Sequence, residues 1–223
     1  DENGELVVNS TTYTPVFADG DLSGAVFQVI AVEDIVTLDG TTRAYAGDVV
    51  SEITTDENGY AETEPLYLGK YEVREIKAPD GYVLNNEPKD VEVTYAGQEF
   101  EVRDTVNTAF ENEYQGVRIS LSKVMENDEL FGIYGKDYYT SVRFGLFAAE
   151  DITAADGSVI PADGLLSEVS LDENMTAKFD VQIPFGRYYV QEIATDEHYI
   201  LNGEKYLVNF EYMGQEVTTV YID

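Results

Sequence analysis

The sequence contains no cysteine, no tryptophan and only one histidine, His198. Without cysteine the chain can form neither a disulfide nor a thiolate nucleophile, and one histidine cannot build a multi-histidine metal site. A serine triad would need His198, and no G-x-S-x-G motif accompanies it. Paired carboxylates could hydrolyse glycosides, but there is no tryptophan for sugar stacking. These absences argue against an enzyme, and the sequence predicts neither a metal nor a cofactor.

Basic residues are also scarce. Thirteen lysine and arginine residues face 44 aspartate and glutamate residues, which gives a net charge of −31. Such an acidic surface repels phosphate backbones and anionic lipid headgroups, so neither nucleic acid nor a membrane surface is a predicted partner. The chain has no run of about 18 apolar residues, and no membrane insertion is predicted for it. A solvated acidic shell is typical of a soluble, exported protein.

The chain does contain ample material for a packed core. Hydrophobic residues make up 43% of it, and there are 17 tyrosines and 10 phenylalanines. That content argues against disorder despite the high charge. A length of 223 residues suits one large domain or two domains of about 110 residues each.

Internal repeats favour two domains. Gly24–Ile35 matches Ser141–Ile152, and Gly69–Ile76 matches Gly186–Ile193, each at a spacing of 117 residues. The spacing changes by no more than one residue from one matching pair to the next, which indicates a duplication. Further matching pairs are Asp56–Asn58 with Asp172–Asn174, Tyr82–Asn85 with Tyr199–Asn202, and Gly97–Glu99 with Gly214–Glu216.

Each copy has the pattern of short β-strands. Tyr71, Val73 and Glu75 alternate with Glu72 and Arg74, as residues on the two faces of one strand do. No segment longer than a turn or two carries a helical apolar stripe. Short strands separated by frequent turns predict an all-β fold of antiparallel sandwiches. The turn signals are Asp39-Gly40, Asn58-Gly59, Asp80-Gly81 and Ala96-Gly97.

The two predicted modules are residues 1–115 and 116–223. The boundary falls near Tyr114, and the second module opens with the alternating strand Val117–Lys123. The join is only a few residues long and is not rich in glycine or serine, so it should limit bending between the modules. We therefore expect two tandem sandwiches arranged end to end in an elongated monomer.

At this point the motifs resemble a known family. The first copy reads GAVFQV, then DENGYAE, then LYLGKYEVREIKAPDGYVL. This order resembles the B-type repeat of collagen-binding adhesins (Cna B-type) and the SpaA-like pilin domains of the prealbumin-like fold. The second copy is less similar, because Thr195–Tyr199 (TDEHY) stands where the first has Ala78–Tyr82 (APDGY) and lacks the proline. The resemblance extends over nearly the whole chain.

Such domains are stalk modules of wall-anchored adhesins and pili of Gram-positive bacteria. The resemblance therefore implies an extracellular structural spacer at the cell wall, with other domains of the same surface protein as its partners. Many of these domains carry an autocatalytic isopeptide bond, in which a lysine of the first strand attacks an asparagine or aspartate of the last strand. A glutamate on a middle strand assists. Burial lowers the pKa of the lysine and keeps the carboxyl protonated, so both can react.

The resemblance assigns these roles to four residues. Glu75 and Glu192 occupy the glutamate position of YEVREI and YYVQEI, and each shares a strand face with apolar neighbours. Lys123 ends the strand ISLSK and matches the nucleophile of the second module. Asn112, in FENEY, matches the acceptor of the first. The alternatives are a strand-end carboxylate that reaches solvent, a surface lysine and a linker asparagine.

Each copy holds only two of the three bonding residues. The first copy has no lysine before Lys70, and the second has no counterpart of Asn112. We expect the missing partners to lie outside this chain, with the missing lysine two residues before Asp1. Neither bond could then form within these 223 residues.

A competing interpretation places the first strand inside the chain. Leu6–Val8 would be that strand, and Asn9 or Ser10 would replace the lysine. Asp223, as the last residue of a strand, is a weak substitute acceptor for Lys123.

The rival function is an adhesive module that contacts a host matrix protein or glycan. The insertion Asn127–Thr140 is the best candidate for a contact loop, since it contains one phenylalanine and three tyrosines. Turns rich in oxygen, such as Asp56–Gly59, lack the spacing of a calcium-binding EF-hand and are explained by turn chemistry. The aromatic residues of the insertion are Phe131, Tyr134, Tyr138 and Tyr139.

Overall fold

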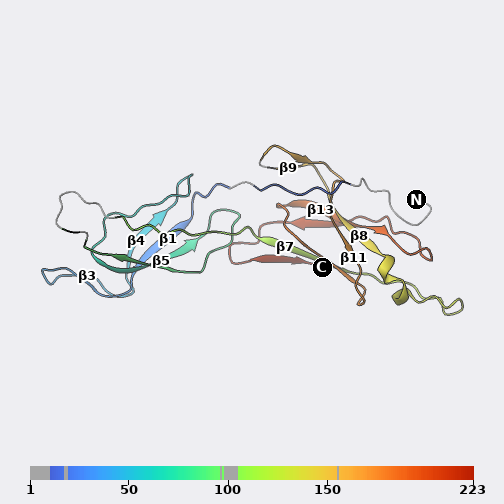
Figure 1. The fold of residues 1–223 in the computed structure, drawn as a ribbon, viewed down its shortest axis with the longest axis horizontal. Coiled ribbons are helices and arrows are strands. Elements are labelled where there is room, and N and C mark those ends of the chain that lie inside the picture. The colour runs from blue at the N-terminus through green and yellow to red at the C-terminus, as the bar shows by residue number, and fades with distance from the viewer. Residues whose placement is uncertain (1–10, 18–19, 96, 98–104, 155) are drawn as a thin grey trace. The chain divides into compact units, whose positions relative to one another are not determined.

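A computed structural model describes residues 11–17, 20–95, 97, 105–154 and 156–223 (Figure 1). These residues form fifteen β-strands and two short 3-10 helices, and no α-helix occurs among them. The all-β prediction is therefore confirmed. The chain forms two compact units. The N-terminal unit comprises Gly20–Gln115 and Gly214–Thr218, and the C-terminal unit comprises residues 11–17, Gly116–Met213 and Thr219–Asp223.

A single four-stranded antiparallel sheet dominates the N-terminal unit, in the order β4-β1-β5-β6 (Figure 1). Alternation places Phe27, Val29, Tyr71, Val73 and Glu75 on the buried face of β1 and β5, as the sequence pattern predicts for β5. The strands are β1 (Val26–Ala31), β4 (Val49–Thr54), β5 (Gly69–Lys77) and β6 (Lys89–Val93), with a small hairpin of β2 (Ile35–Val36) and β3 (Thr42–Ala44).

The C-terminal unit repeats this sheet and adds a second one. The order β11-β8-β13-β14 matches that of the N-terminal unit, and the second sheet has the order β12-β7-β15. Within it β7 is antiparallel to β12 and parallel to β15. The strands are β7 (Gly116–Ser122), β8 (Arg143–Ala148), β9 (Ile152–Thr153), β10 (Val159–Ile160), β11 (Leu165–Ser170), β12 (Thr176–Val181), β13 (Gly186–Ala194), β14 (Tyr206–Phe210) and β15 (Thr219–Ile222).

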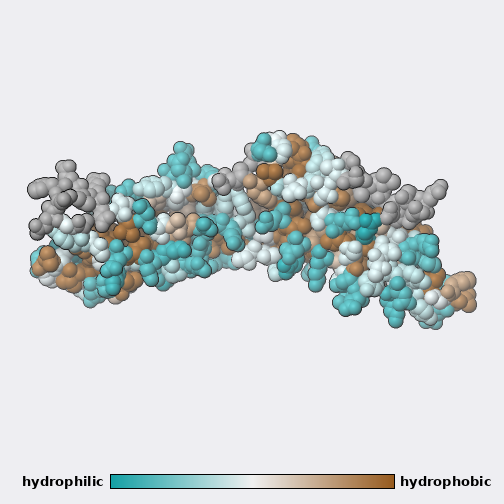
Figure 2. Space-filling model, viewed as in Figure 1, coloured by the Kyte–Doolittle hydropathy of each residue, from teal (hydrophilic) through white to brown (hydrophobic). Residues whose placement is uncertain are grey.

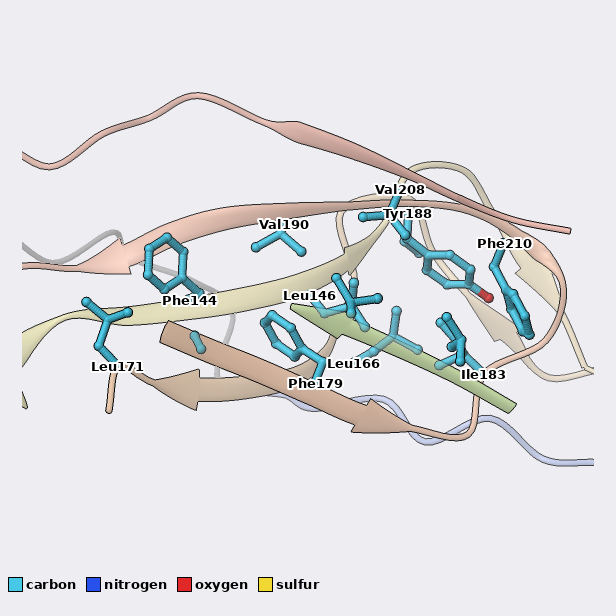
Figure 3. Packing of buried hydrophobic residues seen from close by; sticks show 14 of the residues in the cluster. Phe144, Leu146, Leu166, Leu171, Phe179, Ile183, Tyr188, Val190, Val208 and Phe210 are labelled. Carbon is cyan, nitrogen blue, oxygen red and sulfur yellow. The ribbon is translucent and has the colours of Figure 1, made fainter. Parts of the chain in front are cut away.

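The core of the C-terminal unit lies between its two sheets. Figure 3 shows Phe144, Leu146 and Val190 from one sheet facing Phe179 from the other. Leu146, Phe179 and Tyr188 are fully enclosed. Burial of such large apolar groups on both sheets is the main force that holds a sandwich together.

The duplication seen in the sequence is preserved in the strand register. Phe27 of β1 lies opposite Glu75 of β5, and Phe144 of β8 lies opposite Glu192 of β13. In each unit, a phenylalanine is therefore paired across the sheet with the buried glutamate at the equivalent position.

The second sheet of the C-terminal unit, β12-β7-β15, has no counterpart in the described part of the N-terminal unit. β12 is held in place by β7. The matching residues 60–65 form no strand, although Ala61 and Thr63 are half-buried and alternate with exposed glutamates. The described residues of this unit include nothing equivalent to β7, so the backbone of residues 60–65 lacks the partner that β12 has.

Residues 11–17 pack in the C-terminal unit and not in the N-terminal one. The Tyr13 amide donates a hydrogen bond to the Leu165 carbonyl at 2.8 Å. The predicted module 1–115 includes this segment because of its place in the sequence. Its hydrogen bond to Leu165 instead attaches it to the C-terminal unit. That division of the sequence stays a prediction.

A second segment crosses the predicted boundary in the other direction. Gly214–Thr218 belongs to the N-terminal unit. The side-chain amide of Gln115 donates to the carbonyls of Gly214 and Val217, at 3.0 and 2.6 Å. Gln115 itself is buried, and these two bonds satisfy both of its donors.

The fold predicts where a truncation is costly. Phe179→Ala removes a fully buried ring and should lower the free energy of unfolding by about 3 to 5 kcal/mol. Leu207→Ala is a matched control, because Leu207 is 81% exposed and its loss should change stability by less than about 0.5 kcal/mol. Urea unfolding followed by circular dichroism measures both. Equal effects of the two variants would contradict the assigned core.

Candidate functional site

Glu192 of β13 is the most deeply buried charged residue that the sequence singled out. Its side chain is 1% exposed, and the Lys123 Nζ lies 3.0 Å from Oε1 and 3.1 Å from Oε2. The lysine is 21% exposed and comes from the residue after β7. The structure therefore brings together Lys123 and Glu192, which the sequence placed 69 residues apart.

A backbone amide completes the surroundings of this carboxyl. The Asn202 N–H donates to Glu192 Oε2 at 2.8 Å. Oε1 is enclosed and lies 3.0 Å from Lys123 Nζ, but it accepts no hydrogen bond from the described residues. Lys123 is itself fixed at the main chain, because its N–H donates to the Met175 carbonyl at 2.9 Å. Backbone hydrogen bonds at Lys123 and at Glu192 thus help to hold the ammonium and the carboxyl in contact.

Glu75 of β5 occupies the equivalent position in the N-terminal unit and has a different partner. The Asn112 Nδ2 lies 3.0 Å from Oε1 and 2.8 Å from Oε2 of the 5% exposed Glu75, and donates to both. The same nitrogen donates to the Val83 carbonyl at 3.0 Å. The Asn85 N–H donates to Glu75 Oε2 at 2.6 Å. The structure therefore brings Glu75 and Asn112 together.

Burial has an electrostatic consequence for Glu75. Removal from water raises the pKa of its carboxyl above the ordinary value of 4.5. The hydrogen bonds from the Asn85 backbone and the Asn112 side chain act in the opposite direction and are the smaller influence. Burial therefore favours the neutral form of the Glu75 carboxyl relative to the same group in water.

Sequence reasoning missed the two asparagines that position the backbone donors. Asn85 accepts from the Glu87 amide at 2.9 Å, and Asn202 accepts from the Glu204 amide at 3.0 Å. Each side chain closes a local turn that directs its own N–H toward the buried carboxyl. The signal was present in the repeat, because Leu84-Asn85 matches Leu201-Asn202.

Neither unit brings all three bonding groups together in the described residues. Glu75 and Asn112 contact no lysine there, and Lys123 and Glu192 contact no side-chain amide. Asp223 does not serve as the substitute acceptor. Its carboxylate accepts from the Ser120 hydroxyl, and Ser120 lies on the face of the strand opposite to Lys123. The alternative that Asn9 or Ser10 replaces a lysine lies outside the described residues.

The insertion Asn127–Thr140 forms a hairpin followed by two 3-10 helices, η1 (Gly135–Asp137) and η2 (Tyr139–Ser141). Asp128 and Ile133 exchange two backbone hydrogen bonds of 2.8 and 2.9 Å. Between them Leu130 is 86% exposed and Phe131 is 75% exposed. Figure 2 shows apolar residues at the tip of this hairpin (lower right). The predicted contact loop is therefore a closed hairpin that presents apolar side chains to solvent.

The described part of the chain holds no group of three or more histidine, cysteine, aspartate or glutamate residues arranged for a metal ion. None of its helices is long and apolar enough to cross a membrane.

The family comparison agrees with the resemblance seen in the motifs. Residues 12–108 match the family model of SpaA, described as a prealbumin-like fold domain. This part of the chain contains strands β1 to β6 together with Glu75. The predicted resemblance to SpaA-like, prealbumin-like domains is thereby confirmed.

Individual relatives come from Gram-positive bacteria. The trypsin-resistant surface T6 protein of Streptococcus pyogenes serotype M6 is 31% identical over 84 residues, which is 38% of this chain and 14% of that protein. The solved TIE protein of Bacillus anthracis is 24% identical with a TM-score of 0.50, covering 90% of this chain and 30% of its own. A streptococcal ancillary pilin is 20% identical with a TM-score of 0.31, over 96% and 62% of the two chains.

The similarity covers only part of the length of these relatives. The chain spans less than a third of the T6 and TIE proteins. The TIE structure shows the same fold, and the name of the T6 protein describes a surface protein.

The raised pKa of Glu75 predicts a pH dependence of stability. Since the folded state holds its proton more tightly than the unfolded chain, the contribution of Glu75 is largest at low pH and falls as pH rises above about 4.5. Glu75→Gln should therefore lose less stability than the natural chain between pH 4 and pH 8. Urea unfolding at both pH values measures this difference. Glu62→Gln, which removes an exposed carboxylate, is the charge-matched control.

The Lys123–Glu192 contact predicts a coupling. Lys123→Met leaves the carboxyl of Glu192 buried without its cation, which should cost about 3 kcal/mol, at the low end of the range for a broken buried pair because the lysine is partly exposed. Adding Glu192→Gln should recover part of that loss. A double-mutant cycle by urea unfolding measures the coupling. Additive effects of the two changes would show that the contact contributes nothing.

Proposed function

We propose that the chain is a stalk segment of a Gram-positive surface protein whose units are each built to be closed by a Lys–Asn isopeptide bond. The observation that carries this proposal is the pair of equivalent carboxyls. Glu75 and Glu192 are both buried, both lie opposite a phenylalanine, and both accept a backbone hydrogen bond from the asparagine ten residues later. One carboxyl contacts the acceptor asparagine and the other contacts the nucleophilic lysine.

The contacts support a defined sequence of steps. Glu192 lies within 3.1 Å of the Lys123 ammonium and can accept its proton, which leaves a neutral amine next to a neutral acid. In a complete unit the amine nitrogen attacks the side-chain carbonyl carbon of an asparagine. A new C–N bond forms and the asparagine C–N bond breaks. The carboxyl gives its proton to the leaving nitrogen, which departs as ammonia, and takes up the proton that the attacking nitrogen loses, so the acid is protonated at the end. Proximity supplies much of the rate, since all three groups are held in one core.

The partners absent from each unit would come from residues beyond those described. For the C-terminal unit, alternation along β15 turns Val220 and Ile222 toward the core and Asp223 away from it. An acceptor would therefore lie on the same face as Ile222, one or more residues past Asp223. For the N-terminal unit, a strand equivalent to β7 would end with the lysine next to Glu75 and Asn112.

Such a bond would suit a stalk mechanically. β7 and β15 are parallel neighbours, so tension applied to the two ends of the unit loads this pair in shear. A covalent link between them would block their separation. By analogy with a disulfide that closes a loop of about 100 residues, it would also add roughly 4 to 5 kcal/mol of stability.

We further propose an extracellular, wall-associated location, with the other domains of the same surface protein as the main partners. The T6 relative, the SpaA match and the acidic surface support this reading. A second candidate function, adhesion to a host protein or glycan, is favoured only by the exposed hairpin tip at Leu130 and Phe131. Turnover of an external substrate forms no part of the proposal.

Intact mass tests the proposal. A version of the chain extended by its native flanking residues should weigh less than its sequence mass by one ammonia for each bond formed. Glu192→Ala should fold but keep the ammonia of the C-terminal unit, and Asn112→Ala, which removes the acceptor amide, should abolish the ammonia loss of the N-terminal unit. Asn86→Ala, a neighbouring asparagine outside the site, should leave the mass loss intact. Ammonia loss that persists in Glu192→Ala would show that this carboxyl has no role in the reaction.

A further inference from the structure

Tyr82 and Tyr114 are stacked on each other in the N-terminal unit. Their ring centroids lie 4.4 Å apart with an angle of 27° between the ring planes. The Tyr82 hydroxyl donates a hydrogen bond to the Tyr114 hydroxyl at 2.8 Å. Because the rings overlap while their hydroxyls meet, the carbons next to the oxygen in one ring lie close to those in the other ring.

The main chain fixes this pair. Tyr82 and Tyr114 face each other in an isolated antiparallel bridge, and the Val83 N–H donates to the Glu113 carbonyl at 2.9 Å. Directly opposed residues of antiparallel chains place their side chains on the same face, so the two rings meet. Tyr82 is only 5% exposed, whereas Tyr114 is 42% exposed. One ring is therefore enclosed and its partner is open to solvent.

Gly20 shapes the place where the two hydroxyls meet. Its N–H donates to the Tyr82 hydroxyl oxygen at 3.1 Å. A Cβ atom at position 20 would lie 2.5 Å from the Tyr82 hydroxyl and 2.8 Å from the Tyr114 hydroxyl, which is too close for non-bonded atoms. Both hydroxyls can keep this contact only because residue 20 has no side chain.

A pair with this geometry is suited to oxidative coupling. One-electron oxidation of a phenol removes an electron and a proton and leaves a phenoxyl radical, whose unpaired electron is shared with the carbons next to the oxygen. The exposed ring of Tyr114 can be oxidised directly. Through the hydrogen bond, the Tyr82 hydroxyl can then give its hydrogen atom to the Tyr114 radical, and a second oxidation of Tyr114 leaves a radical on each ring.

We propose that Tyr82 and Tyr114 form a modification site, which a haem peroxidase with hydrogen peroxide converts into an intramolecular dityrosine. The two radicals join through a carbon–carbon bond between ring positions next to the oxygens. The hydrogens on those two carbons then move to the oxygens and restore both phenols. The protein loses two electrons and two protons in all, and these reduce one hydrogen peroxide to two waters. Proximity favours this pair over separate tyrosines.

The cross-link would secure the segment that carries Asn112. This residue lies two positions before Tyr114, and its side-chain nitrogen donates to the carbonyl of Val83, which follows Tyr82. A covalent bond between residues 32 positions apart restricts the unfolded chain as a disulfide does. The bond needs no lysine, so it forms whether or not the isopeptide bond proposed above exists.

A purely structural pair is the competing explanation, since stacking and a hydrogen bond also stabilise a fold. Tyr138 and Tyr199 of the C-terminal unit provide a comparison. Their ring centroids lie 6.3 Å apart at an angle of 60°, and the Tyr199 hydroxyl donates to the Glu126 carbonyl at 2.8 Å. This second pair is near but not stacked, so oxidation should distinguish the two pairs.

Peptide mapping after oxidation tests the proposal. The full chain, in dilute solution to suppress coupling between molecules, is treated with a haem peroxidase and hydrogen peroxide. It is then digested with a glutamate-specific protease. Tandem mass spectrometry identifies peptides that are joined through two tyrosines and weigh two hydrogens less than their sum. Coupling of Tyr82 to Tyr114 should exceed coupling of Tyr138 to Tyr199 by at least about 10-fold.

Three variants refine the test, with circular dichroism to check that each one folds. Tyr114→Phe should abolish the joined peptide, and Gly20→Ala, which pushes the hydroxyls apart, should lower its yield by about 10-fold. Tyr60→Phe removes a tyrosine that is 55% exposed and should leave the yield unchanged. After oxidation the natural chain should unfold at a higher urea concentration, whereas Tyr114→Phe should not.

The natural chain alone can overturn the proposal, whatever the variants do. Oxidation of exposed tyrosines without a peptide that joins Tyr82 to Tyr114 would show that the stacked pair is structural only. Equal coupling at the stacked pair and at Tyr138 and Tyr199 would show that the geometry of the pair confers no selectivity.

Discussion

A carboxyl group buried against apolar neighbours is the constraint on which both units depend. Placing Glu75 and Glu192 on the inner face of a sheet removes each from water, and such a group is tolerated only when partners surround it. Each unit supplies one donor from its own backbone, at Asn85 or Asn202, through a turn closed by that asparagine. The loop after β5 or β13 is therefore as necessary to the site as the strand itself.

The side-chain partner of this carboxyl differs between the two units. In the C-terminal unit the partner is the ammonium of Lys123, and in the N-terminal unit it is the amide of Asn112. Together they are the two halves of the reaction centre that we propose. This complementarity is a stronger argument for isopeptide chemistry than either unit alone, because an ordinary structural salt bridge would have no reason to alternate with an amide at the same position.

Much of this arrangement could be predicted from the sequence. Period-two alternation placed Glu75 with Tyr71 and Val73, and the repeat transferred the same role to Glu192. These inferences depend on local geometry, which short-range patterns encode well. The positions of residues 11–17 and Gly214–Thr218 could not be predicted in that way, since they depend on hydrogen bonds between residues far apart in the chain.

The outer face of β13 shows a second limit of sequence patterns. The equivalent strand β5 alternates between buried and exposed residues, but β13 is buried on both faces because Phe147, Leu165 and Tyr189 form a separate cluster behind it. The sequence contains these apolar residues without saying what covers them. Asp223 was likewise a weak candidate acceptor by its place at the end of a strand, and the register of β15 turns it toward Ser120 instead.

The chemical state of Lys123 in the parent protein is the most direct test of isopeptide closure. The protein isolated from its native source can be digested with a glutamate-specific protease and sequenced by tandem mass spectrometry. The account predicts that the peptide containing Lys123 is joined through its side chain to a residue that follows Asp223. Recovery of that peptide with a free, unmodified lysine in all of the material would contradict it.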